Sequence, residues 1–331
     1  MYIADSKRYD KMKYNYVGNS GLKLPQISLG FWHNFGYEKD YEEVKKVVLK
    51  AFDKGITHFD LANNYGRPAG SAESNLGKIL SNELKDYRDE LIISTKAGWM
   101  MWEGPYGDFG SRKYLMASLN QSLKRLNLDY VDIFYHHRPD PDTPLLETMT
   151  ALADIVKQGK ALYVGISSYP TELALEAKKI LETLGVPLLI HQPSYSMLNR
   201  WVQDTNLDVE MEKNGVGIIP FSILSQGLLT NKYLHGIPSD SRAANKDVPN
   251  LNENQITEEL LLKLNKLNKI AEKRNQSLAQ MAVSYTCIQK GFSSVLIGVS
   301  KLEQLEANLD ALDNLEFSKE EIIEIENIIK N

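Results

Sequence analysis

The sequence predicts one large α/β domain, a (β/α)8 TIM barrel spanning residues 1–331. Short apolar runs with few charges are typical of buried parallel strands, and amphipathic stretches typical of helices lie between them. This alternation repeats about eight times at roughly 40 residues per unit, which is the pattern of a (β/α)8 barrel. A doubly wound open sheet is the alternative, but it would need a break in the repeat that the sequence does not contain.

The chain begins with an extension and a predicted β-hairpin. Residues 1–12 carry no regular hydrophobic pattern, so we expect an N-terminal extension or loose arm there. The segments Lys13–Val17 and Leu22–Leu24 flank the segment Gly18-Asn19-Ser20-Gly21. Glycine adopts the positive φ angles of tight turns without strain, so this arrangement predicts a hairpin ahead of the barrel.

The barrel strands and helices follow in alternation. The predicted strands are Ile27–Gly30, Thr57–Asp60, Leu91–Lys96, Val131–His136, Ala161–Ile166, Pro187–His191, Gly217–Phe221 and Ser294–Ile297. Amphipathic spacing predicts helices at Tyr41–Lys54, Tyr114–Leu126, Leu145–Val156, Glu172–Leu184 and Leu302–Leu312.

Two helix starts carry local signals. Thr143 and Pro144 predict a hydroxyl N-cap followed by proline at the first helical position. Ser318 and Glu321 form a capping-box pattern, which predicts a final helix to about Lys330.

Two long irregular segments, Ala97–Ser111 and Leu224–Asn254, interrupt the repeat. Long loops inside a compact domain are usually functional or disordered. The tryptophan, tyrosine and phenylalanine content of Ala97–Ser111 favours a functional loop there.

Composition and charge exclude several classes of protein. The formal net charge is −5 and the pI about 5.8, the reverse of the basic footprint of a nucleic-acid-binding protein. The single cysteine, Cys287, cannot form an intramolecular disulfide and lies in the apolar helical run Ala279–Ile288, where we expect a buried thiol. The chain shows neither a signal peptide nor an apolar run long enough to span a membrane, so we expect a soluble cytoplasmic protein.

Polar side chains stand at the predicted carboxyl ends of the strands, where barrel enzymes hold their active sites. They are Asp60, Lys96, His136 or His137, Ser167, Ser168, Gln192 and Ser222, and Tyr65 follows in the loop after Asp60. A nearby ammonium would lower the pKa of a tyrosine from its usual value of about 10 and make it a better acid. A neighbouring aspartate would keep that lysine charged and oriented.

Each of these residues also has a plain structural interpretation. Asp60 could cap the turn after its strand, Lys96 could be a solvated rim residue, and Tyr65 could be a packing residue. Side chains alternate across a strand, so at most one of His136 and His137 can face the barrel mouth. Spacing alone leaves open which histidine that is.

Several motifs resemble those of the aldo-keto reductase family, over about Met12 to Leu312. They are Phe59-Asp60-Leu61-Ala62-Asn63-Asn64-Tyr65-Gly66, Gly70-Ser71-Ala72-Glu73, Ser94-Thr95-Lys96, His137-Arg138-Pro139-Asp140, Gly165-Ile166-Ser167-Ser168 and Gly298-Val299-Ser300-Lys301-Leu302-Glu303-Gln304. The chain looks most like the branch of potassium-channel β-subunits and bacterial glyceraldehyde-3-phosphate and methylglyoxal reductases. The segments Gly30-Phe31-Trp32-His33-Asn34-Phe35-Gly36 and Gly104-Pro105-Tyr106-Gly107 resemble the bacterial reductases in particular.

The resemblance implies the catalytic tetrad Asp60, Tyr65, Lys96 and His137. The family's histidine stands two residues before a proline, as His137 does, and this selects His137 over His136. The channel-type members carry asparagine there. The histidine therefore favours a working reductase over a cofactor-sensing subunit.

The resemblance also implies an NADP(H) site on the barrel rim, and the sequence lacks the Gly-x-Gly-x-x-Gly motif of a Rossmann site. The implied cofactor residues are Ser167, Ser168, Gln192, Phe221, Ser222, Leu224, Gln226, Gly227, Lys232, Arg242, Gly298, Ser300, Gln304 and Asn308. Ser167, Ser168 and Gln192 would hydrogen-bond the carboxamide. Phe221 would stack on the nicotinamide ring.

The loop after the seventh strand would face the cofactor phosphates. Leu224, Gln226 and Gly227 would pass along the pyrophosphate, where small residues and backbone N–H groups suit an anion. Lys232 and Arg242 would neutralise phosphate charge.

Ser300, Gln304 and Asn308 lie at helical spacing near a predicted helix start, which is a favourable seat for a phosphate. By spacing alone they would be a plain polar helix face, and the motif match favours the cofactor interpretation. Many relatives have Glu-Asn where this chain has Ala307 and Asn308, next to the implied adenine contact. Arg242 near Ser300 would favour NADPH over NADH.

The residues themselves give less support to the predictions of a substrate pocket and of partners. Trp32, His33, Trp99, Trp102 and Tyr106 would form an aromatic-walled pocket, although a lid that packs on itself would use the same side chains. The resemblance implies small aldehydes such as methylglyoxal or phosphorylated trioses, and a possible homo-oligomer. We expect no metal, nucleic-acid or membrane partner.

The predicted function is NADP(H)-dependent reduction of small aldehydes and ketones. Tyr65 would donate the proton, Lys96 would lower its pKa, and His137 would orient the carbonyl. A channel-β-type redox-sensing subunit with little turnover is the alternative. A Schiff-base aldolase using Lys96 ranks last, because pairing with Asp60 keeps that lysine charged rather than nucleophilic.

Overall fold

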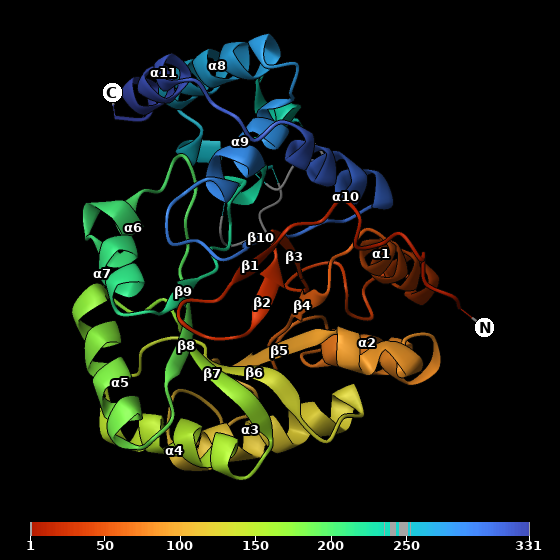
Figure 1. Cartoon of the computed structure of the whole chain (residues 1–331), viewed down its shortest axis with the longest axis vertical. Coiled ribbons are helices and arrows are strands. Elements are labelled where there is room, and N and C mark those ends of the chain that lie inside the picture. The colour runs from red at the N-terminus through yellow and green to blue at the C-terminus, as the bar shows by residue number, and fades with distance from the viewer. Residues whose placement is uncertain (1, 235, 239–242, 245–250, 252, 331) are drawn as a thin grey trace.

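The computed structural model describes residues 2–234, 236–238, 243–244, 251 and 253–330. Within these residues, eight parallel strands form one sheet in the order β10-β3-β4-β5-β6-β7-β8-β9 (Figure 1). Their bounds are β3 Ile27–Gly30, β4 His58–Asp60, β5 Ile92–Ala97, β6 Val131–His136, β7 Ala161–Ser167, β8 Leu188–Gln192, β9 Gly217–Ile218 and β10 Val295–Ile297.

Backbone hydrogen bonds close this sheet into a barrel. The N–H of Ser293 donates to the carbonyl of Ile218 at 2.8 Å, and the N–H of Leu296 donates to the carbonyl of Pro220 at 3.0 Å. These bonds join the β9 edge to the β10 edge. The predicted (β/α)8 barrel is confirmed, and its predicted strands match the observed ones closely.

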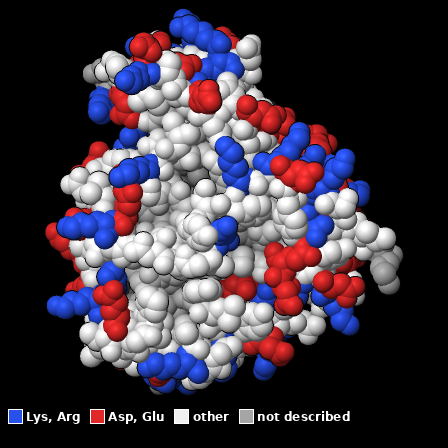
Figure 2. Space-filling model, viewed as in Figure 1, with Lys and Arg blue, Asp and Glu red and all other residues white. Residues whose placement is uncertain are grey.

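Amphipathic helices surround the barrel (Figure 1). Their bounds are α1 Tyr41–Asp53, α2 Ser71–Asn82, α3 Arg112–Leu126, α4 Leu145–Lys157, α5 Thr171–Thr183, α6 Trp201–Asp204, α7 Leu207–Lys213, α8 Glu258–Lys273, α9 Leu278–Cys287, α10 Leu302–Leu309 and α11 Lys319–Lys330. In α1 the Asp40 side chain caps the first turn, and the stripe containing Val44, Val48 and Ala51 is buried against the strands. Charges of both signs are interspersed over the helices at the edge of the face seen in Figure 2.

The predicted hairpin is present and closes one end of the barrel. Strands β1 Tyr14–Tyr16 and β2 Lys23–Pro25 pair antiparallel. Val17 and Leu24 are fully buried and pack with side chains of the barrel interior. The turn bonds to the carbonyl of Gly215, which precedes β9, so the hairpin lies at the amino ends of the strands. The carboxyl ends at the other side are left for a functional site.

The N-terminal extension is docked, and the prediction of a loose arm is wrong. Tyr2 donates through its hydroxyl to Asp53 of α1 at 2.6 Å. Arg8 forms an ion pair with Glu90 at 2.6 Å, and its guanidinium lies 5.1 Å from the Phe52 ring centroid. Polar side chains with partners on two elements hold this segment without any hydrophobic periodicity.

The two predicted helix starts had different outcomes. Ser318 and Glu321 form the predicted capping box, with backbone-to-side-chain hydrogen bonds of 2.7 and 3.1 Å. Pro144 occupies the N-cap rather than the first helical position, with a ψ of 128°, so the prediction of Thr143 as N-cap is wrong by one residue.

Cys287 ends α9 and is half-buried against the main core, and burial raises the pKa of its thiol. Within the described residues, no helix combines the length and the apolar character needed to cross a membrane.

Candidate active site

A buried ion pair lies at the carboxyl ends of β4 and β5. Asp60 ends β4, Lys96 lies in β5, and both side chains are fully buried. The ammonium of Lys96 donates to Asp60 Oδ2 and, at 2.7 Å, to the carbonyl of Leu61. Burial lowers the pKa of Lys96, while the charges of Asp60 and Glu73 raise it. Lys96 is thus a paired interior residue and not a solvated rim residue.

The other carboxylate oxygen of Asp60, Oδ1, also accepts hydrogen bonds. Ser94 Oγ donates to Asp60 Oδ1 at 2.6 Å, and Gln192 Nε2 donates to the same oxygen at 3.2 Å. A carboxylate that accepts several hydrogen bonds is stabilised in its charged form. The interpretation of Asp60 as a simple turn cap is therefore not supported, because its bonds run to side chains on β5 and β8.

Tyr65 lies against this pair. The ammonium of Lys96 is 5.2 Å from the Tyr65 ring centroid, and the tyrosine is 8% exposed. Burial, with the charge of Asp60, raises the pKa of Tyr65 well above 10. The expected lowering of the Tyr65 pKa by Lys96 is not met in this structure, because burial and then the charge of Asp60 raise that pKa. The phenol keeps its proton at neutral pH, which is the state a proton donor requires.

His137 is the histidine that lies beside Tyr65. It directly follows β6, and its ring centroid is 5.8 Å from that of Tyr65. Burial and the charge of Lys96 lower the pKa of His137 well below 6.5, so the imidazole is neutral at pH 7. Among the described residues its buried Nδ1 has no hydrogen-bond partner. His136 instead bonds through Nδ1 to the hydroxyl of Tyr169 at 2.6 Å.

Arg138 contacts several residues of the aromatic loop Ala97–Ser111, which follows β5. Its guanidinium lies 3.9 Å from the ring centroid of Trp99 and 4.4 Å from that of Phe109. It also pairs with both carboxylate oxygens of Asp108 and donates to the carbonyl of Gly98 at 2.7 Å. The sequence reasoning missed this residue, although it stands in the His137-Arg138-Pro139-Asp140 motif beside the tetrad.

The predicted pocket aromatics separate into three groups. Trp99 meets the His137 ring edge-on at 6.3 Å, so it lies beside the tetrad. Trp32 and His33 stack on each other at 4.1 Å. Trp102 packs on the ring of Tyr114, and Tyr106 is 55% exposed at the surface.

Ser167, Ser168 and Gln192, the predicted carboxamide residues, come together next to Asp60. Ser167 Oγ donates to the carbonyl of Gln192 at 2.9 Å, and the N–H of Ser168 donates to the same carbonyl at 3.1 Å. Ser168 has a φ of 59°, in the left-handed region that residues other than glycine rarely adopt. The amide nitrogen of Gln192 bonds Asp60, so one residue contacts both predicted parts of the site.

The segment after β9 has a strained backbone. Phe221 is half-buried, and Ser222, Ser225 and Gln226 have φ angles of 60°, 45° and 60°. Such angles are costly for these residues and cluster at ligand-binding sites. Gln226 Oε1 is buried without a partner among the described residues, and a side chain at Gly227 would meet only open space apart from Tyr233 at 3.8 Å. The strained backbone and the open space at Gly227 fit a ligand that passes along this segment.

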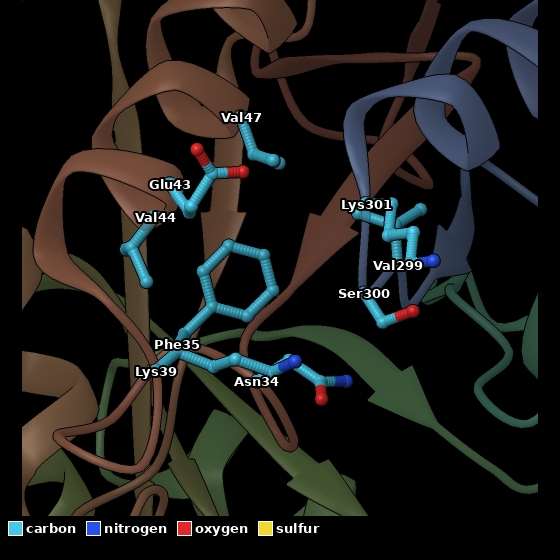
Figure 3. Close-up of a pocket in the computed structure, with 9 residues that line it drawn as sticks. All are labelled: Asn34, Phe35, Lys39, Glu43, Val44, Val47, Val299, Ser300 and Lys301. Atoms are coloured by element: carbon cyan, nitrogen blue, oxygen red, sulfur yellow. The ribbon is translucent and has the colours of Figure 1, made fainter.

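The start of α10 presents polar groups at the surface. The N–H and Oγ of Ser300 both donate to Gln304 Oε1, at 2.8 and 3.0 Å, whereas Asn308 is buried. Ser300 helps to line a cavity of about 20 Å³ together with Asn34 and Phe35. Figure 3 shows Phe35 between the α1 side chains and the turn that carries Ser300.

Four further predicted cofactor residues have less definite surroundings. Leu224 accepts through its carbonyl from the N–H of Gly227 at 2.9 Å, which forms the turn after β9. Gly298 follows β10 and is exposed, and Lys232 is exposed in a short 3-10 helix. Arg242 lies outside the described residues.

Comparisons with known proteins identify the family of the chain. The Aldo/keto reductase family model matches residues 26–330. The chain is 55% identical over 329 residues to the L-glyceraldehyde 3-phosphate reductases of Escherichia coli O157:H7 and of Escherichia coli strain K12, covering 98% of this chain and 95% of each relative. It is 34% identical over 323 residues to a probable voltage-gated potassium channel subunit beta of Oryza sativa subsp. japonica, covering 97% of each chain.

Proposed function

Because the chain belongs to the aldo/keto reductase family and is an oxidoreductase acting on carbonyl groups, we propose that it reduces small aldehydes and ketones to alcohols with NADPH. The observation that carries the proposal is the buried Asp60–Lys96 pair with the Tyr65 ring beside its ammonium. Three mutually positioned titratable groups at the carboxyl end of a barrel are typical of an active site.

The cofactor would lie along the rim from β7 to α10. Ser167, Ser168 and Gln192 would hold its carboxamide, and the strained segment with Gln226 and Gly227 would pass along the pyrophosphate. Ser300 would exchange its bonds with Gln304 for bonds to a phosphate. When bound, NADPH supplies the hydride that the carbonyl carbon receives.

Tyr65 would act as the general acid. Its phenol is protonated at neutral pH and gives up its proton only as the carbonyl oxygen becomes strongly basic during reduction. The resulting phenolate would lie near the Lys96 ammonium, which stabilises the negative charge. A positioned general acid contributes about 10²–10⁴ in rate.

His137 would orient the substrate. Because its imidazole is neutral, one ring nitrogen carries a proton and can donate to the carbonyl oxygen. Trp99 stands edge-on to His137 and would form one wall of the pocket. Neutral donors of this kind position a carbonyl without protonating it.

For the substrate we propose phosphorylated trioses and methylglyoxal. The support is the 55% identity to proteins named L-glyceraldehyde 3-phosphate reductase. The 34% identity to a probable channel β-subunit favours a second candidate, a redox-sensing subunit that binds NADPH and turns over slowly.

A panel of aldehydes, with NADPH absorbance as the readout, separates the two candidates. We expect many equivalents of NADPH to be consumed per protein when L-glyceraldehyde 3-phosphate or methylglyoxal is present, and none without a carbonyl. Oxidation that stops after one equivalent per protein, with every aldehyde tested, would favour the sensing subunit instead.

A further inference from the structure

A row of buried polar side chains runs from Asp60 across the barrel strands. Ser94 Oγ lies 2.6 Å from Asp60 Oδ1, and His58 Nε2 lies 3.0 Å from Ser94 Oγ. His58 Nδ1 lies 2.9 Å from Ser28 Oγ, and Ser28 Oγ lies 2.6 Å from Ser294 Oγ. All five residues are at most 2% exposed. They come from β5, β4, β3 and the residue before β10, so the row crosses four adjacent strands.

The chemistry of the groups fixes the direction of this row. An ionised carboxylate only accepts, so the Ser94 hydroxyl donates to Asp60. Ser94 therefore accepts from His58, and the proton of the imidazole is on Nε2. Burial lowers the pKa of His58 to about 4, so at pH 7 the ring is neutral and its Nδ1 is an acceptor. Ser28 then donates to His58 and accepts from Ser294.

We propose that His58, with Ser94 and Ser28, is a positioning element of the active site. The one-way hydrogen-bond chain holds the Asp60 carboxylate in one orientation, and Asp60 in turn holds the Lys96 ammonium beside Tyr65. Hydrogen bonds in such a chain polarise one another, which strengthens the bond that reaches the carboxylate. The catalytic consequence rests on the proposed function, whereas the direction of the chain is a property of the fold.

The groups around Asp60 show why the hydrogen bonds to its carboxylate matter. The titratable groups that face it or its partner are Lys96 on β5, Tyr65 in the loop after β4, Tyr135 on β6, His58 on β4, His137 after β6 and Glu73 on α2. Burial keeps both tyrosines protonated and both histidines neutral near pH 7. The charge on Asp60 therefore depends on Lys96 and on the hydrogen bonds that Ser94 and Gln192 donate.

The first test is the tautomer of His58, measured by ¹⁵N NMR of the full chain labelled in histidine. We expect a neutral ring protonated on Nε2 at pH 7. His191 is an internal control with the opposite state, because its Nε2 accepts from the N–H of Tyr169 at 3.1 Å and its proton must be on Nδ1. A proton on Nδ1 of His58 overturns the direction of the chain and with it the proposal. This readout needs no substrate or turnover.

The second test compares His58→Gln with His58→Leu. The glutamine amide nitrogen can replace the Nε2 donor to Ser94, whereas leucine cannot. Losing the hydrogen bond from His58 to Ser94 weakens the support of Asp60 without removing the bond from Ser94, so we expect kcat in His58→Leu to fall about 3- to 10-fold with NADPH affinity retained. The acidic limb of its kcat–pH profile should move to higher pH because the hydrogen-bond chain that ends on the active-site carboxylate is cut. His58→Gln should recover most of both effects.

A matched control removes a buried hydroxyl elsewhere. Ser284 on α9 accepts from Gln276 and donates to the carbonyl of Ala311, and Ser284→Ala should leave kcat and its pH profile unchanged. Equal impairment of His58→Gln and His58→Leu, or a pH profile that does not move in His58→Leu, would show that His58 only packs. If the wild-type protein reduces no carbonyl, the proposed function fails, and the tautomer alone decides the direction of the chain.

Discussion

The two halves of the barrel rim are built differently. At the ends of β4 and β5, Asp60 and Lys96 are fully buried and bond to each other. From the turn after β9 to α10, Ser222 and Gln226 have left-handed backbone angles, and Ser300 is exposed and bonded to its own helix. Among the described residues the buried amide oxygen of Gln226 has no partner.

This difference indicates which half of the rim depends on a ligand. In the proposed catalytic half, Asp60, Lys96 and Ser94 bond to one another, and among the described residues the buried Nδ1 of His137 is left without a partner. The half predicted to hold the cofactor has strained backbone angles at Ser222, Ser225 and Gln226, and such strain clusters at ligand-binding sites. On the proposed function, the acid residues are therefore preformed, and NADPH would complete the other half. Five substitutions or conditions test this contrast, from the largest expected effect to the smallest.

Tyr65→Phe should have the largest effect, because it removes the only proposed proton donor and leaves the ring in place. We expect kcat to fall by about 10²–10⁴ while NADPH still binds, measured by steady-state kinetics and by the fluorescence of bound NADPH. Tyr135→Phe is the matched control, since its ring is also near Lys96, at 5.5 Å, and it should lose little activity. Equal activity in Tyr65→Phe and wild type would contradict the mechanism.

Asp60→Asn should destabilise the fold as well as stop turnover. It leaves the Lys96 ammonium buried without its carboxylate, and breaking a buried pair costs about 3–5 kcal/mol. Urea unfolding measures the loss. The control Glu43→Gln breaks the exposed pair with Lys46 and should leave the free energy of unfolding unchanged within error. A loss no greater than that of the control would mean that the buried pair is not structural.

Acid should destabilise the protein below about pH 6.5, because that is the ordinary pKa of histidine. Burial lowers the folded-state pKa of His58 and His136 to about 4 and that of His191 to about 3. The unfolded chain therefore binds more protons as pH falls, so stability present above pH 6.5 is lost below it. The slope is about 1.4 kcal/mol per pH unit for each histidine at most. Urea unfolding at several pH values checks it, and a constant stability from pH 7 to about 5 would contradict these shifts.

Arg138→Lys should weaken substrate binding more than chemistry. Lysine keeps the charge but cannot stack as a plane between Trp99 and Phe109 or form the same bonds to Asp108. Losing such stacking costs about 1 kcal/mol, so we expect KM for the aldehyde to rise about fivefold with kcat nearly retained. An unchanged KM would place the loop 97–111 outside the substrate site.

Ser300→Asp should have the smallest effect and should act on the cofactor alone. A carboxylate near the extra phosphate of NADPH would repel it and reduce NADPH affinity about threefold, while NADH affinity stays the same. Ser300→Ala, which removes the hydroxyl without adding charge, is the control. A loss of affinity for both cofactors in Ser300→Asp would mean that Ser300 does not lie near the distinguishing phosphate.

Much of the fold could be predicted because the strands are short, apolar and separated by amphipathic helices. Ile27–Gly30 and Val131–His136 were predicted with the observed bounds. Helix α2 was missed because its buried face includes Ser71, Glu73 and Asn75, which hide the hydrophobic period. Polar residues of this kind are buried only because other elements supply their partners.

The sequence predicted which residues lie at the candidate site, but it did not predict how they interact. The sequence placed Asp60 and Lys96 at neighbouring strand ends, and both lie there. It could not show that Asp60 pairs in register with Ser94, or that burial would raise the pKa of Tyr65. Charge balance and cross-strand contacts depend on register and burial, which a linear pattern does not contain.

Amide hydrogen exchange with and without NADPH tests the contrast between the two halves most directly. The account predicts that NADPH increases protection in residues 222–229 and at the start of α10, while β4 and β5 are equally protected in both states. Protection that changes mainly in β4 and β5, or in neither half, would contradict a preformed acid site completed by its cofactor.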